Sequence, residues 1–60
     1  MNIKKLRVKV GLTQKELSKK LGYKHQSAIG MMETGKRNIP SDKIPILAEA
    51  LGCEIKDLFE

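Results

Sequence analysis

Sixty residues are enough for one small domain, and the single cysteine excludes an intramolecular disulfide, so we expect one domain, residues 1–60, stabilised by packing alone. Residues 1–40 carry ten of the twelve Lys and Arg and two of the seven Asp and Glu, whereas residues 41–60 have a slight acidic excess. With an overall charge of +5, this distribution indicates a basic face that binds a polyanion. The alternative is ordinary charge that keeps a small protein in solution. No apolar run approaches the roughly 20 residues of a membrane span, and the N-terminus has no signal-peptide core, which predicts a cytoplasmic protein. No Cys, His or carboxylate residues have the spacing of metal ligands, so we expect neither a metal nor another cofactor.

The first predicted helix covers residues 2–10. Ile3, Leu6 and Val10 have the spacing of one helical face. Asn2 is a suitable N-cap and the glycine at position 11 a suitable stop. The end of this segment also alternates apolar and basic residues with period two, so a strand at 7–10 is the alternative, but leucine and lysine favour the helix.

The second predicted helix, residues 13–21, has the sharpest local signal. Thr13 followed by Glu16 makes a capping box, in which each side chain accepts a hydrogen bond from the other residue's backbone N–H. Leu12 and Leu17 have the spacing of a hydrophobic staple across this start. We expect Leu17 to be buried, Gly22 to take the left-handed position after the helix, and the lysines to face solvent: Lys15, Lys19 and Lys20.

A third helix is predicted over residues 26–33, after a turn at 23–25. Its inward face has Ile29 and Met32, flanked by Ala28. Its outward side is only partly polar and consists of Gln26, Ser27, Gly30, Met31 and Thr34. Two short helices joined by a Gly-containing turn on a basic background suggest a helix-turn-helix.

The rest of the chain predicts two further helices, at 42–51 and 54–59. Ser41 or Asp42 would cap the fourth helix, with Pro45 in its first turn if Asp42 is the cap, and Ile39 would return the chain to the core. The apolar face of the fourth helix is Ile44, Leu47, Ala48 and Leu51, and that of the last segment is Ile55, Leu58 and Phe59. The predicted fold class is therefore all-α, a compact bundle of five short helices.

Three stretches carry a family resemblance: GLTQKELSKKLG at 11–22, SAIGMMETGKRNIP at 27–40 and IPILAEALGCEIKDLF at 44–59. In this order they resemble the Cro/lambda-repressor-like, or XRE-type, helix-turn-helix family, from about residue 5 to residue 59. The resemblance implies a transcriptional regulator of phage, plasmid or bacterial origin that binds double-stranded DNA as a homodimer, with residues 26–34 in the major groove. Repression is favoured over activation, because so small a domain has little surface for recruiting polymerase.

The resemblance also assigns roles to single residues. Gln26 and Ser27 stand where bases are contacted, and Met31 stands where a further base contact is made, for example to a thymine methyl. Arg7 and Glu33 stand where relatives have a buried ion pair. Phosphate contacts fall on Gln14 in the second helix and on four residues beside the third: Lys24, His25, Lys36 and Arg37.

Two departures from the family pattern leave alternatives open. The stretch from Gly22 to Glu33, which contains the turn, is one residue longer than is common in the family, and this leaves the alignment of residues 23–25 open. Gly30 and Met31 replace the usual polar residues, which suits the alternative of a protein-interaction module such as an antitoxin.

A membrane-surface peptide is disfavoured by the helix caps and the acidic C-terminal third. Nothing indicates an enzyme or a small-molecule substrate.

Three further residues have simpler interpretations. Tyr23 is expected to pack in the turn, with its hydroxyl free to meet a phosphate. Cys53 is expected to be a small buried hydrophobic residue. The outer edge of the apolar residues in 54–59 is the expected dimer contact, because so short a chain has no separate oligomerisation domain.

Overall fold

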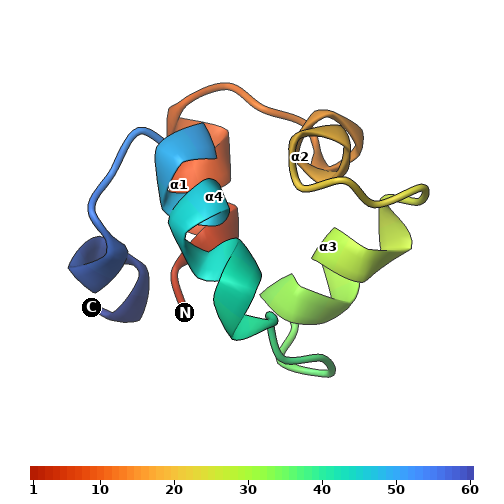
Figure 1. Ribbon diagram of the computed structural model, residues 1–60. Coiled ribbons are helices and arrows are strands. Elements are labelled where there is room, and N and C mark those ends of the chain that lie inside the picture. The colour runs from red at the N-terminus through yellow and green to blue at the C-terminus, as the bar shows by residue number, and fades with distance from the viewer.

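The computed structural model describes residues 1–60, and every element in it is helical. Four are α-helices, α1 (Ile3–Lys9), α2 (Gln14–Lys20), α3 (Ser27–Glu33) and α4 (Ile44–Ala50), and two are 3₁₀ helices, η1 (Ser41–Lys43) and η2 (Ile55–Phe59) (Figure 1). The all-helical class is confirmed. The strand alternative at 7–10 is wrong, since α1 runs to Lys9.

The predicted count of five short helices differs from the structure, in which the separate 3₁₀ helix η1 precedes α4 and the last segment forms the 3₁₀ helix η2. It is only five residues long, and short helical segments often adopt the tighter 3₁₀ geometry. Its start resembles that of α2, since the backbone N–H of Glu54 donates to Asp57 Oδ2 at 3.0 Å.

One hydrophobic core joins these helices. Its completely buried apolar side chains come from α1, α2, α3, α4 and η2, or directly follow α2 and α4: Ile3, Leu17, Leu21, Ile29, Leu47, Leu51 and Leu58. Val10 was predicted to share the apolar face of the first helix, and this is wrong, since α1 ends before Val10 and its side chain is exposed. Of the apolar residues in η2, only Leu58 is buried, whereas Ile55 and Phe59 are exposed.

The predicted capping box of α2 is present. The backbone N–H of Glu16 donates to Thr13 Oγ1 at 3.0 Å, and the backbone N–H of Thr13 donates to Glu16 Oε1 at 2.9 Å. The hydrogen bond from the Thr13 backbone is the main reason why the pKa of Glu16 is lowered. Leu12 packs on the core, and Gly22 has φ +81°, the left-handed conformation expected after the helix. Local sequence therefore fixes both ends of α2.

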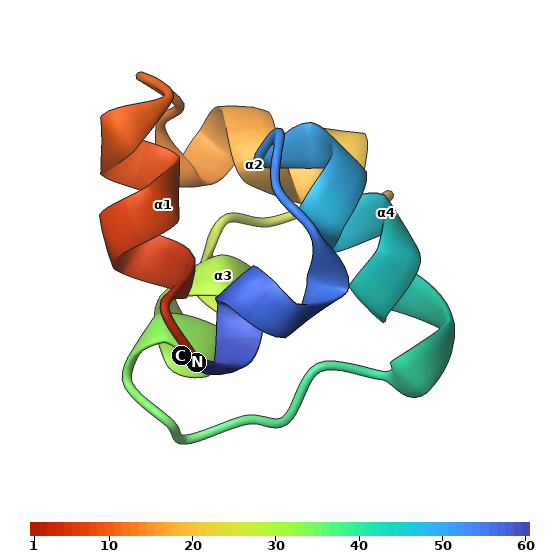
Figure 2. The ribbon, with the colours of Figure 1, turned by 90° about the vertical axis from the view of Figure 1, so that its left-hand side faces the viewer.

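Two other predicted caps are not formed. Asn2 is at the N-cap of α1, but its side chain donates to the backbone carbonyl of Glu60 instead, and its backbone N–H donates to Leu58 O at 2.9 Å. Ser41 and Asp42 both lie inside η1, so that Lys43 becomes the N-cap of α4 and Pro45 falls in the first turn, where it has no N–H to lose. Asn2 thus joins the two chain ends, which lie side by side in Figure 2.

The helix-turn-helix pair and the C-terminal segment lie on different sides of the molecule. In Figure 1, α2 and α3 are at the right and η2 is at the left, with α1 and α4 between them. In Figure 2, which shows the molecule from that left-hand side, η2 is in front and α3 lies behind it. A partner that covered η2 would therefore leave α3 accessible.

Candidate nucleic-acid interface

A network of hydrogen bonds holds α3 against the two preceding helices. Arg7 Nε of α1 donates to Glu33 Oε2 of α3 at 2.6 Å, forming the ion pair, and Gln14 Nε2 of α2 donates to Glu33 Oε1 at 2.8 Å. Arg7 also donates to the Leu12 carbonyl oxygen at 2.8 Å. The side chains of Arg7 and Glu33 are only 11% and 3% exposed. The network therefore connects the C-terminal end of α3 to both α1 and α2.

The charge of Glu33 is maintained by its partners. Burial acts to raise the pKa of this carboxyl group, but the hydrogen bonds from Arg7 and Gln14, together with the nearby positive charge, lower it below its usual value. Glu33 is thus a carboxylate at neutral pH, as the ion pair requires.

Gln14 belongs to this network and is also partly exposed at the surface. The resemblance assigns it to a phosphate, and the structure places it half-buried at the start of α2, with one amide N–H committed to Glu33. A primary amide has two N–H donors and one acceptor oxygen. One donor is therefore used inside the chain, and the second remains for a ligand.

The N-terminal part of α3 presents polar groups to solvent. Gln26 and Ser27 are exposed, and the Gln26 side chain does not cap the helix. Met31 is 39% exposed on the same helix. Thr34, expected on the outward side, turns its hydroxyl back to the helix, where it donates towards the carbonyl oxygens of Gly30 and Met31 at 3.1 and 3.2 Å. The outward polar groups of α3 are therefore concentrated at its start.

Gly30 lies where α3 meets α2. It is half-buried, and a Cβ added to it would lie 3.6 Å from Gln14 Nε2, an ordinary van der Waals distance. It is not among the glycines with positive φ. Neither backbone conformation nor space therefore requires glycine here, and Gly30 belongs to the α2–α3 contact more than to the outward side.

Four exposed residues assigned to phosphates flank α3 at both ends. Lys24 and His25 precede it in the turn, and Lys36 and Arg37 follow it in the loop. Polar groups at the start of a helix can hydrogen-bond base edges, and cations on either side of it can contact phosphates.

Tyr23 lies between this loop and η1. The guanidinium carbon of Arg37 is 5.3 Å from the centre of the Tyr23 ring, and Lys43 Nζ is 5.1 Å from it. Lys43 also donates to the Leu21 carbonyl oxygen at 2.8 Å, at the end of α2. Nothing in the sequence pattern singled out Lys43, because its partner is 22 residues away.

The Tyr23 hydroxyl is not available to a phosphate. Its oxygen is buried and has no hydrogen-bond partner. The expectation of a free hydroxyl is therefore wrong, because the ring packs on the core with the hydroxyl end inward of the surface.

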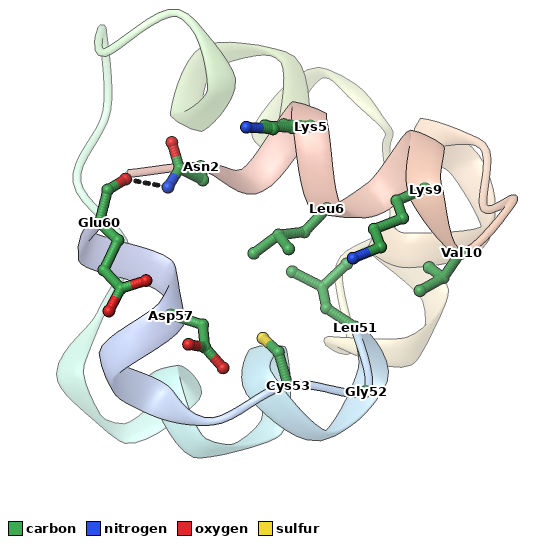
Figure 3. A pocket seen from close by; sticks show the side chains of 10 residues that line it. All are labelled: Asn2, Lys5, Leu6, Lys9, Val10, Leu51, Gly52, Cys53, Asp57 and Glu60. Atoms are coloured by element: carbon green, nitrogen blue, oxygen red, sulfur yellow. Dashed lines mark hydrogen bonds between the residues drawn. The ribbon is translucent and has the colours of Figure 1, made fainter.

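A separate groove of about 510 Å³ lies between α1 and the C-terminal segment (Figure 3). Leu6 and Leu51 are among its apolar residues, while Lys5 and Asp57 are among its charged ones. Cys53 is half-buried here rather than buried, and burial raises the pKa of its thiol, with a smaller contribution from Asp57. None of the residues assigned to DNA lines this groove.

No group of three His, Cys, Asp or Glu side chains lies close enough together to hold a metal ion. None of the helices has the length and apolar character needed to cross a membrane.

Comparison with known proteins agrees with this architecture. The sequence pattern of the helix-turn-helix family matches residues 3–58. A protein of Archaeoglobus fulgidus named as an uncharacterized HTH-type transcriptional regulator is 38% identical over 58 residues, which cover 95% of this chain and 80% of that protein. Proteins of this kind are regulators that bind DNA and are not generally enzymes. The chain belongs to the XRE-type helix-turn-helix family.

Proposed function

We propose that residues 1–60 act as one sequence-specific DNA-binding domain of a cytoplasmic transcriptional repressor, with residues 26–34 inserted into the major groove. The observation that carries the proposal is the start of α3. Gln26 and Ser27 are exposed there, and the Gln26 side chain has no capping role in its own helix. A glutamine amide can form two hydrogen bonds with the N6 and N7 edge of adenine.

The flanking residues supply affinity that does not depend on sequence. Lys24 and His25 contact the backbone before α3, and Lys36 and Arg37 contact it after α3. Gln14 adds its second amide N–H from α2. Such contacts fix the register of the helix on the duplex, while Gln26, Ser27 and Met31 distinguish the bases.

The proposal includes a homodimer formed through η2. Ile55 and Phe59 are 46% and 59% exposed, although both are large apolar side chains. They lie in the segment opposite the α2–α3 pair (Figure 1). Two copies joined there would present two copies of α3 to half-sites about one helical turn, ~34 Å, apart on the DNA.

A protein-interaction module is the second candidate. It is favoured by the exposed apolar side chain of Met31 on α3. The two candidates differ in salt dependence, because DNA binding releases counterions and weakens steeply as salt rises, whereas an apolar protein contact does not.

The experiment is a selection of bound sequences from random duplex DNA, made with the parent protein and with Gln26→Ala. We expect an enriched motif with the parent, and a loss of preference at one base pair in each half-site with Gln26→Ala. Glu49→Ala serves as the control, because Glu49 is exposed on α4, outside both η2 and the residues assigned to DNA, and should leave the motif unchanged. The absence of any enriched motif would contradict sequence-specific binding, whereas a motif unchanged by Gln26→Ala would contradict only the role of Gln26.

A further inference from the structure

The ring of Tyr23 joins three segments that are separate in sequence. Tyr23 itself belongs to the turn between α2 and α3, Arg37 to the loop after α3, and Lys43 to η1. Both cations lie within about 5.3 Å of the ring centre, a distance at which the negative face of an aromatic ring attracts a positive charge.

The two cations have different freedom. Lys43 is committed to the Leu21 carbonyl oxygen, to which it donates at 2.8 Å. Arg37 takes part in neither of the ion pairs in the chain, and its side chain is exposed. The ring is therefore the contact that holds the Arg37 guanidinium in place.

The stacked position suits a guanidinium that binds a phosphate. A guanidinium is planar and carries its five N–H donors around its edge, so that one face can lie on a ring while the edge remains available to an anion. Fixing the group beforehand also reduces the conformational entropy that is lost when a ligand is bound.

We propose that Tyr23 is a positioning residue, which uses its ring to hold Arg37 ready for a DNA phosphate. This inference rests on the proposed function, since it needs DNA binding to have an effect. The hydroxyl has no part in it, because its oxygen is buried without a partner. Tyr23→Phe should therefore retain the arrangement, and Tyr23→Leu should lose it.

The test measures binding to random-sequence duplex DNA between 50 and 200 mM salt for four proteins: the parent, Tyr23→Phe, Tyr23→Leu and Arg37→Gln. One lost phosphate contact lowers the slope of log K against log[salt] by about 0.9. We expect this reduction with Arg37→Gln and with Tyr23→Leu, and none with Tyr23→Phe. The affinity advantage of the parent over Tyr23→Leu should then shrink about threefold across this range of salt.

A double variant separates positioning from a general loss of structure. If Tyr23 acts through Arg37, then Tyr23→Leu should lower the slope no further when Arg37→Gln is already present. A second reduction of similar size would overturn the inference, as would a full slope for Tyr23→Leu alone or a reduced slope for Tyr23→Phe. A parent protein whose binding does not depend on salt would instead overturn the proposed function.

A measurement on the parent covers the case in which Tyr23→Leu does not fold. Protons lying over an aromatic ring resonate upfield, so the side-chain protons of Arg37 should be shifted upfield in the NMR spectra of the parent and of Tyr23→Phe. Ordinary random-coil shifts for Arg37 in the folded parent would overturn the inference without any use of DNA.

Discussion

The two helices of the helix-turn-helix pair are stabilised in different ways. α2 has the reciprocal cap of Thr13 and Glu16 at its start and Lys19 and Lys20 in its last turn. α3 has no side-chain cap, no acidic residue in its first turn and no basic residue in its last turn, and it contains Gly30. It is held instead by buried side chains and by Glu33. The helix proposed to enter the DNA thus depends on its inward face, and its outward side chains are free for a ligand.

The largest effect is expected from removing the anchor of α3. Glu33→Ala leaves Arg7, which is 11% exposed, without its counter-charge, and breaking such a buried pair costs roughly 3–5 kcal/mol. Urea unfolding at neutral pH measures the loss of free energy of unfolding. The control is Lys56→Ala, whose ion pair with Glu54 is largely exposed and contributes little. A Glu33→Ala protein that melted within a degree or two of the parent would show that α3 is not held by this pair.

Acid should weaken the same anchor. The pKa of Glu33 is lowered in the folded chain, against about 4.3 when unfolded. The folded state therefore binds this proton less readily, so the contribution of Glu33 is complete above the unfolded value and is lost as the pH falls through the folded one.

Urea midpoints measured from pH 7 to pH 3 should consequently fall more for the parent than for Glu33→Gln. Glu16 also has a lowered pKa, but it is present in both proteins and cancels in this comparison. Two curves that stayed parallel down to pH 3 would contradict the assigned role of Glu33.

An intermediate effect is expected at the two helix starts. Thr13→Ala removes a formed cap and should cost about 1 kcal/mol, because one backbone N–H of α2 loses its acceptor. The matched change in α3, Gln26→Ala, removes no cap and should stay within about 0.5 kcal/mol of the parent. Thermal or urea unfolding distinguishes them, and equal costs at the two positions would remove the proposed difference between the helices.

The smallest effect should have the opposite sign. Gly30→Ala should stabilise the protein by about 0.5–1 kcal/mol, because alanine is the better helix former and the new Cβ has room beside Gln14. Gly35→Ala provides the contrast, since Gly35 has φ +80° after α3 and any Cβ there is strained. If Gly30→Ala were as damaging as Gly35→Ala, the α2–α3 contact would be tighter than the structure shows.

The difference between α2, stabilised by local residues, and α3, held by distant ones, also explains which features of the fold could be predicted from the sequence. The limits of α2 follow from Thr13, Glu16 and Gly22, residues whose effects are local, and the buried face of α3 follows from the spacing of Ile29 and Met32. Lys43 and the Tyr23 ring escaped prediction, because their contacts join segments far apart in the chain. The cap assigned to Asn2 was wrong for the same reason, whereas the cap assigned to Ser41 or Asp42 was wrong for a local reason. Asn2 is taken by Glu60 at the other end of the chain, and η1 displaces the start of α4.

The contacts of single side chains with DNA were predicted on a different basis. Gln26 and Ser27 are exposed whether or not they contact bases, so exposure alone does not distinguish a base contact from a solvated helix start. Their assignment depends on the family resemblance, together with their place at the start of α3 between two groups of basic residues.

DNA should bind to the surface of α3 and its flanking cations. Titration of the ¹⁵N-labelled protein with duplex DNA, followed by amide chemical shifts, tests it most directly. We expect the largest changes at residues 24–27, 31 and 36–37, with little change around Cys53 and Asp57 in the groove on the other side of α1. Changes centred on that groove, or none at low salt, would contradict it.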